Sequence, residues 1–421
     1  MLKPALRFAF VVVVSLVLLT SRGSLHLTPV EELAKVHLYS LVQWELENFL
    51  DKWLYRVRLL ILGDSLDEQA KVDLVLEYFQ LGKRGNELKR VIEEARDSPQ
   101  GGEGDPLDAL EAELTQLKET QGSMRNNVEE VVEGTIDSIV AKEGLVARGP
   151  IRALEIHFPP VDFRLEPSPR VLVVSPRDRI EMITGILLTP GITVEEMEAL
   201  EEQVLKERDL SILVQSTGGV ATYPAVISPD FSLKGMLITA AHEWLHHYLF
   251  FHSLGRGYGK NPDVTSLNET LATIFGREVG EMAYMKFEAD QMADSSTQSV
   301  ETSPTSEDES PEDKFDFRLE MHTTRVRTEE LLGEGKIEEA EQYMEDRRLF
   351  LAKNSHYIRK LNQAYFAFHG TYADSPESIS PIFDQLSDLR SASLSLGNFV
   401  KVVAAVSSYE EFLELLEGQA P

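Results

Sequence analysis

The sequence predicts an α+β fold that is predominantly helical, and three observations support this prediction. Apolar residues recur every three or four positions over much of residues 29–140. Short β-type runs bounded by proline and glycine follow between residues 149 and 227. Helical spacing then returns and continues almost to the C-terminus. We therefore expect a core region at residues 149–293 between helical regions at residues 25–148 and 314–421.

Composition limits the classes of function. The 421-residue chain has 41 basic and 70 acidic residues, which gives a formal charge of −29. Such a surface repels nucleic acid and anionic lipid head groups, so we expect no nucleic-acid partner. Cysteine is absent. Disulfides, thiol catalysis and cysteine-ligated zinc are therefore excluded.

Residues 1–24 predict export. Lys3 and Arg7 precede an uncharged run over residues 8–20, which is the plan of a secretory signal. Residues 21–24 lack a small-x-small cleavage site, so an uncleaved membrane anchor is the alternative to a cleaved signal. A buried N-terminal strand or helix of a cytoplasmic protein is a further interpretation. We expect an exported chain, either secreted or attached to a membrane by this segment.

Two long helical stretches follow, over residues 29–96 and 107–140, with a loop composition between them. The second begins with a heptad-like stripe of the kind found in coiled coils. This stripe is short, so packing of the two stretches as a helical hairpin is expected instead. Trp44 and Trp53 lie on the first stretch, where core packing and contact with a membrane surface are the two interpretations. The stripe consists of Leu107, Leu110, Leu114 and Leu117.

The β-type runs predict a small sheet, interrupted by one helix. Thr193 followed by Glu196 is a capping box, which predicts a helix over residues 193–208. The expected strands lie within residues 154–158, 170–175, 211–215 and 220–227.

The C-terminal part begins after an acidic segment. Residues 294–313 contain acidic but no basic side chains, together with many Ser, Thr and Pro, which predicts a disordered linker. The expected C-terminal helices cover residues 325–332, 337–353, 358–368, 382–393 and 399–416.

A motif with chemical meaning lies in a helical stretch over residues 235–258, which Ser232 can cap. It reads His242-Glu243-Trp-Leu-His246. Residues four apart share one face of a helix, so His242 and His246 can hold one metal ion, and Glu243 can reach a water molecule beside it. The alternative is a structural or merely exposed histidine pair.

A third metal ligand is expected on the next helix. A catalytic zinc ion commonly has three protein ligands, and two histidines with one carboxylate are a standard set. A second helical pattern begins at Ser266 and contains Glu269. Glu269 is therefore the expected ligand, and Glu278 and Glu281 are its substitutes.

The two segments resemble those of the gluzincins, the thermolysin and aminopeptidase N type of zinc metallopeptidase. In that class the third ligand is a glutamate on the following helix. In the aminopeptidase branch this glutamate often lies within an Asn-Glu-x-x-Ala motif, which the sequence Asn268-Glu269-Thr-Leu-Ala272 matches. The resemblance covers about 50 residues. No Gly-Ala-Met-Glu-Asn motif is present, and Thr273 stands where thermolysin-like enzymes have an aspartate. Neither subfamily is therefore indicated.

The resemblance implies a zincin-like core, one zinc ion per chain and a peptide or protein substrate. It also implies an edge strand along the cleft that can bind extended peptide, for which residues 216–223 are the candidate. Glu243 would act as the general base. Stabilising the carbonyl oxygen needs a further donor, for which Tyr258 and His369 are predicted. Tyr365 and Tyr372 were the other candidates, and His247 and His252 are assigned to packing or the surface.

The sequence therefore predicts a zinc metallopeptidase and leaves its endo- or exopeptidase character and its oligomeric state open. A helical scaffold tethered to a membrane, with a structural or vestigial zinc site, is one alternative. A zinc hydrolase of other amides or esters is another, since it would use the same residues.

Overall fold

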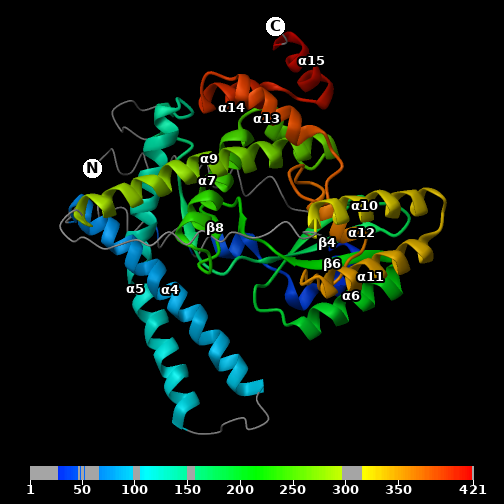
Figure 1. The fold of residues 1–421 in the computed structure, drawn as a ribbon, viewed down its shortest axis with the longest axis horizontal. Coiled ribbons are helices and arrows are strands. Elements are labelled where there is room, and N and C mark those ends of the chain that lie inside the picture. Colours follow the sequence, from blue (N-terminus) through cyan, green and yellow to red (C-terminus); the bar gives the residue numbers. More distant parts are fainter. Residues whose placement is uncertain are drawn as a thin grey trace.

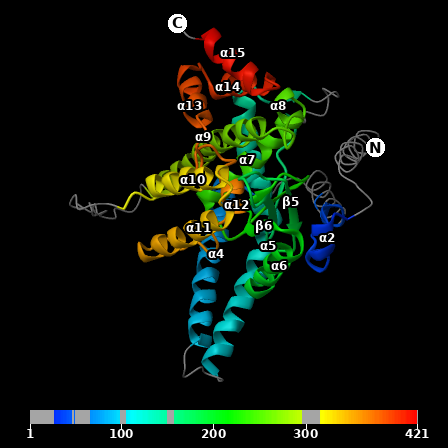
Figure 2. The same ribbon diagram turned by 90° about the vertical axis from the view of Figure 1, so that its right-hand side faces the viewer.

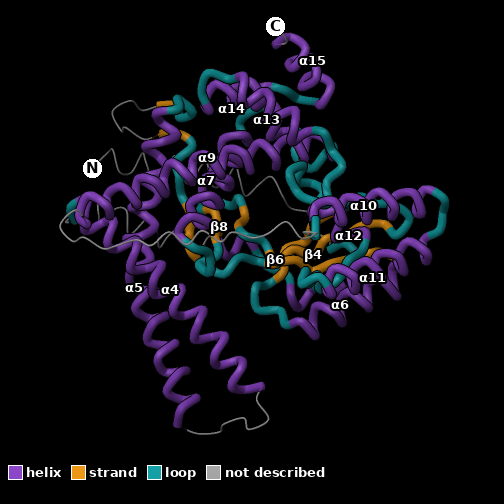
Figure 3. The backbone as a smooth tube through the Cα atoms, in the orientation of Figure 1, coloured by secondary structure: helices purple, strands orange, loops and turns teal. Residues whose placement is uncertain are grey.

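The computed structural model describes residues 27–45, 48, 52, 66–97, 105–148, 157–295 and 315–419. These residues form a predominantly helical α+β fold, as predicted, in which a few short strands lie among many helices (Figures 1 and 3). The proposed signal or anchor at residues 1–24 lies outside the described residues, as does most of the acidic segment 294–313.

The N-terminal helices form the predicted hairpin. After α2 (Pro29–Leu33) and the 3-10 turn η1 (Lys35–His37), the long helices α4 (Glu68–Asp97) and α5 (Asp105–Lys142) pack against each other along much of their length. The hairpin extends away from the rest of the molecule, at the end opposite the C-terminal helices (Figure 2). The base of α5 contributes Val132 and Ile136 to the largest core.

Trp44 belongs to the protein core. Its side chain is only 8 % exposed, and its indole Nε1 donates a hydrogen bond to Glu166. This contact supports core packing and argues against the alternative of membrane contact. Trp53 lies outside the described residues.

The prediction of a membrane-bound protein is corrected. Across the part of the chain that the structure describes, no helix is both long enough and apolar enough to cross a membrane. The segment that suggested an anchor is not among these residues.

A three-stranded antiparallel sheet has the order β5-β4-β6, formed by Thr184–Leu188, Arg170–Pro176 and Leu210–Ser216. Strands β4 and β6 are mostly buried on both faces, whereas the edge strand β5 begins with the exposed residues Thr184 and Gly185. The helix α6 (Val194–Arg208) and α2 cover one face. The opposite face packs against α12 (Gln363–His369), with α10 (Phe317–Gly333) and α11 (Ile337–Lys353) beside it. Thr193 caps α6 with the predicted capping box.

A second three-stranded sheet directly precedes the motif helix in the chain. Its order is β3-β8-β7, from Phe163–Leu165, Ala225–Ile227 and Gly219–Val220, with β3 parallel and β7 antiparallel to β8. Within the described residues β7 is an edge strand, and it lies in the segment 216–223 chosen from the sequence. The short strands β1 (Ala147–Arg148) and β2 (His157–Phe158) form a separate pair.

The motif helix α7 (Leu233–Phe250) crosses α9 (Pro262–Ser295) at close range, with α8 (Ser253–Arg256) between them in the chain. This helix pair makes the most extensive contact in the structure, inside the largest core. Two glycines of α9 allow the approach. A Cβ atom added at Gly276 would lie 2.8 Å from the carbonyl oxygen of Ile238, and one at Gly280 would lie 2.7 Å from the Cα atom of Ile238. The crossing holds the N-terminal half of α9 against the motif.

Replacing Gly280 by Ala should therefore lower the free energy of unfolding by about 1–3 kcal/mol, the usual cost of overpacking a core. Gly134 on α5 gives a matched control, because it is exposed and a Cβ atom there would meet no atom within 4 Å. Gly134→Ala should stabilise by up to about 1 kcal/mol through helix propensity alone. Denaturant unfolding of both variants measures the difference, and equal behaviour would mean that the crossing tolerates a wider separation.

The C-terminal helices α13 (Ile382–Ala392), α14 (Leu396–Ala405) and α15 (Tyr409–Gln419) pack over α9. Three predicted helix boundaries in the C-terminal part were wrong. The helix expected over residues 325–332 begins at Phe317, where Asp316 caps it by accepting a hydrogen bond from the amide of Leu319. The helix expected over residues 358–368 begins only at Gln363, because Asn362 caps it by accepting a hydrogen bond from the amide of Tyr365. The helix expected over residues 399–416 is two helices, and the Ser408 hydroxyl caps the second by accepting from the amide of Glu411.

Candidate metal centre

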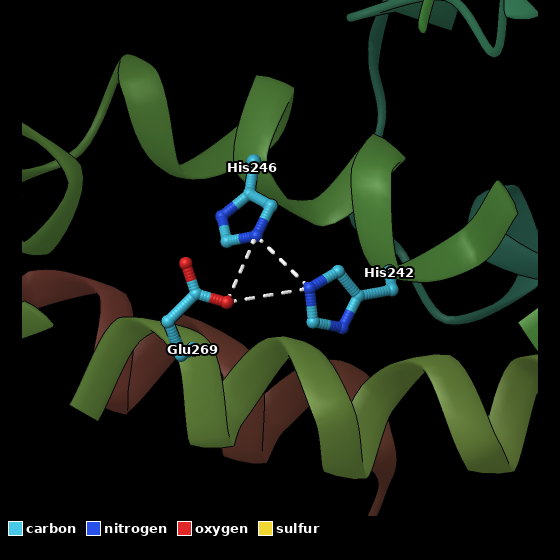
Figure 4. A group of neighbouring side chains, drawn as sticks. All are labelled: His242, His246 and Glu269. Carbon is cyan, nitrogen blue, oxygen red and sulfur yellow. Dashed lines mark hydrogen bonds and ion pairs between the residues drawn. The ribbon is translucent and has the colours of Figure 1, made fainter. Parts of the chain in front are cut away.

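The helix α7 presents His242 and His246 to a single point. Ser232 caps the helix as predicted, by accepting a hydrogen bond from the amide of Gly235. The two imidazole rings project from successive turns, and their Nε2 atoms are 3.1 Å apart (Figure 4). Glu269 reaches the same point from α9. The structure thus brings together the three ligands predicted from sequence.

The spacing of the three atoms fits one tetrahedral metal ion. The Oε2 atom of Glu269 is 3.5 Å from His242 Nε2 and 3.6 Å from His246 Nε2. A zinc ion binds such atoms at about 2.0–2.1 Å, so the edges of a regular tetrahedron around it are about 3.3–3.4 Å long. In addition, Glu269 Oε2 is buried and has no hydrogen-bond partner among the described residues. A cation at the centre would satisfy it.

The substitutes for Glu269 are engaged elsewhere. Glu278 forms an ion pair with Arg390 of α13, with 2.8 Å between oxygen and nitrogen. Glu281 pairs with Lys234 at the start of α7. Glu269 is therefore the carboxylate that the fold offers to the two histidines.

Further contacts hold two of the three ligands in place. The Asn268 side-chain oxygen lies 2.9 Å from His246 Nδ1, so that nitrogen carries a proton, and Nε2 is the ring nitrogen directed at Glu269 Oε2, where a metal ion can replace its proton. The hydroxyl of Tyr258 donates a 2.5 Å hydrogen bond to Oε1 of Glu269, the oxygen that faces away from the histidines. Thr273, at the position where thermolysin-like enzymes have an aspartate, contacts neither histidine; its hydroxyl donates a hydrogen bond to the backbone carbonyl of Glu269.

The electrostatics of the cluster favour an added positive charge. Glu243 and Glu269 are only 7 % and 4 % exposed. Burial tends to lower the pKa of His246, but the Glu269 carboxylate outweighs it and raises the pKa to about 9. Burial in turn opposes ionisation of Glu269, yet the two histidines hold its pKa well below the usual range. Buried carboxylates without a compensating cation are costly, so this site suits a metal ion.

Glu243 lies beside the ligands, against the edge strand β7. A Cβ atom at Gly219 would come within 2.6 Å of Oε1 of Glu243, so only glycine leaves room for the carboxylate at this place. Burial raises the pKa of Glu243, while His242 and His246 oppose the rise. A carboxylate with a raised pKa is a better proton acceptor than one at the surface.

Tyr258 and His369, the two residues predicted to stabilise the carbonyl oxygen, have different surroundings. Tyr258 contacts Glu269, as described, and its ring centroid is 5.9 Å from that of His246. His369 lines the same cleft at the end of α12, but its ring packs on Tyr365 at 4.3 Å. Tyr365 is turned away and donates a hydrogen bond to Glu377.

Tyr372, another candidate from the sequence, lies beside the cluster in the structure. Its ring centroid is 6.5 Å from that of His242, and the charge of Glu269, together with burial, raises its pKa well above the usual value. It follows α12 in a loop, so no helical or strand periodicity marks it. Its place beside the cluster depends on how α12 packs on the sheet.

His247 was assigned to packing, but it makes a specific contact. Its Nε2 atom lies 2.7 Å from the carbonyl oxygen of Thr222, just beyond β7. Burial lowers its pKa to about 4, against the effect of this hydrogen bond, so the ring is neutral at neutral pH. His252, by contrast, lies at the junction of α7 and α8 and stacks on Tyr248 at the end of α7, which fits the packing role expected.

The cluster opens into a cleft of about 2100 Å³. Strand β7, the motif face of α7 and the loop before α9 form its inner wall, and α12 with the loop after it forms another. The edge strand β5 lines the far side. Several apolar side chains are exposed along the cleft, namely Val42, Met182, Ile183, Phe250, Phe251 and Ile379.

No protein-family model, curated protein or solved structure matches this chain, so the geometry of the cluster and its cleft is the basis for assigning a function.

Proposed function

We propose that this protein is a zinc-dependent metallopeptidase with a zincin-like core of gluzincin type. One observation carries the proposal. His242, His246 and Glu269 direct three ligand atoms to one point at tetrahedral spacing, and the buried carboxylate of Glu243 lies on the same helix at the edge of a cleft. A purely structural site has no need of the adjacent general base, which favours the enzyme over the scaffold.

A zinc ion held by these residues would act as a Lewis acid toward water and toward a substrate carbonyl group. Glu243 removes a proton from the attacking water as the new C–O bond forms at the carbonyl carbon. It then transfers this proton to the amide nitrogen as the C–N bond breaks, which releases an amine and a carboxylic acid. The hydroxyls of Tyr258 and Tyr372, and the ring of His369, are the candidates to donate a hydrogen bond to the carbonyl oxygen.

The cleft supports a peptide or protein substrate. Its length and exposed apolar side chains suit an extended chain with large apolar residues. The edge strand β7 offers backbone groups for pairing with such a chain. We also propose that the chain is exported, on the strength of the signal-like residues 1–24.

The test is metal content followed by substrate screening. Elemental analysis of the purified protein should give about one zinc ion per chain, as a three-ligand site requires, and the His246→Ala variant should lose it. The zinc-loaded protein should then cleave members of a quenched-fluorescence peptide library. A folded protein that stays free of zinc after reconstitution would contradict the proposal and favour a helical scaffold. Zinc without peptide cleavage would favour a hydrolase of other amides or esters.

A further inference from the structure

The helix α7 carries a second pair of residues four apart, next to the ligand pair. Glu243 and His247 follow His242 and His246 by one position each, so their face is rotated by about 100°. This face meets the segment around β7 at two points. The carboxylate of Glu243 lies against Gly219, and His247 Nε2 lies against the carbonyl of Thr222. One face of the helix therefore holds the cluster, and the adjacent face holds the edge strand.

The contact of His247 is directional. A carbonyl oxygen only accepts hydrogen bonds, so Nε2 of His247 carries the proton and donates it. The other ring nitrogen, Nδ1, is buried and has no partner among the described residues. The ring of Tyr223 packs edge-on against the imidazole at 5.7 Å. His247 thus fixes the backbone at residues 222 and 223 rather than merely filling space.

The position of this backbone matters for the cleft. Strand β7 has only two residues and is paired on one side, with β8, within the described part of the chain. So short a strand has few ladder hydrogen bonds to hold it, and the contact with His247 adds an anchor just beyond its end. An extended peptide that pairs with β7 would be aligned by the same backbone that lies against Glu243.

We propose that His247 is a positioning residue for substrate. It anchors the segment after β7 to the metal-binding helix, so that a peptide paired with β7 presents its backbone to Glu243 and the ligand cluster. This inference rests on the proposed function, since it supposes a peptide in the cleft. It assigns His247 no contact with the reacting atoms.

Two substitutions at His247 distinguish the contribution of its hydrogen bond from that of its aromatic ring. His247→Gln keeps an N–H group at the position of Nε2, whereas His247→Phe keeps the ring and removes the donor. His252→Phe is the control, because His252 lies at the junction of α7 and α8 and contacts the carbonyl of Tyr248 rather than β7. All variants are loaded with zinc and checked for metal content.

Two probes then distinguish an effect on metal binding from an effect on pairing with strand β7. Acetohydroxamate binds a zinc ion but is too short to pair with β7, whereas the hydroxamate of acetyl-Leu-Phe-Ala can do both. We expect His247→Phe to weaken the tripeptide hydroxamate by about tenfold, the scale of one or two net hydrogen bonds, and to leave acetohydroxamate unchanged. His247→Gln and His252→Phe should bind both probes within about twofold of the wild type. Hydrogen exchange of residues 217–224 should be faster in His247→Phe only.

Equal binding of the tripeptide hydroxamate by wild type and His247→Phe would overturn the inference, as would equal weakening of both probes. A wild-type protein that binds the tripeptide no better than acetohydroxamate would also overturn it, whether or not the protein hydrolyses another substrate. Failure of the proposed function is seen separately, as zinc-loaded wild type that cleaves no peptide, because these binding measurements require no turnover.

Discussion

Glu243→Gln should abolish peptide hydrolysis while the protein keeps its zinc. Glutamine has nearly the shape of glutamate and fits beside Gly219, but it cannot accept the proton of the attacking water. General base catalysis contributes about 10²–10⁴-fold, so kcat should fall by about this factor. Steady-state kinetics on a peptide selected from the library, together with elemental analysis of the same sample, measure both quantities.

The matched control is Glu281→Gln, which makes the same chemical change at a carboxylate paired with Lys234, away from the ligands. This variant should keep near-normal turnover. If Glu243→Gln also turned over at the rate of the wild type, Glu243 would not be the base, and another proton acceptor in the cleft would have to replace it.

Glu269→Ala should reduce zinc affinity by more than about 100-fold, because loss of an outer contact to a ligand already costs about 10–100-fold. The substitution removes the only carboxylate that the described structure directs between His242 and His246. It also removes the partner of the Tyr258 hydroxyl. Competition with a chelator of known zinc affinity measures the change.

Glu278→Ala is the control for this prediction, since Glu278 lies on the same helix but pairs with Arg390. It should retain one zinc ion per chain. Normal zinc affinity in Glu269→Ala would move the third ligand elsewhere and would remove the main support for a gluzincin-like centre.

Local signals in the sequence were sufficient to predict many of the helices and strands. The capping residues Thr193 and Ser232 marked the starts of α6 and α7, because an N-cap is defined by a side chain and the backbone three residues on. Tertiary packing decided the rest. No local pattern shows that β3 pairs in parallel with β8, about sixty residues later. The break between α14 and α15 was missed because apolar spacing continues across the serines that cap the second helix.

The residues of the candidate site also fall into those that local sequence patterns could predict and those whose placement depends on tertiary packing. His242 and His246 were found because helix geometry alone brings residues four apart together. Glu269 was expected from its place on the next helical segment and from the resemblance. The structure gives its choice over Glu278 and Glu281 a physical reason, since those two carboxylates have basic partners on α13 and at the start of α7. Tyr372 was one of several aromatic candidates, and the sequence could not show that it lies beside His242, because this approach depends on contacts between segments more than 100 residues apart.

The close crossing of α7 and α9 also means that binding of a metal ion at this site would be thermodynamically linked to folding. The ligands come from both helices, so the unfolded chain offers no preformed site. A cation that binds only the folded arrangement therefore adds to the free energy of unfolding, by about 2.7 kcal/mol at a free concentration 100 times its dissociation constant. Gly276 and Gly280 would thus affect metal affinity without contacting the ion, because whatever separates the helices would weaken both the core and the site.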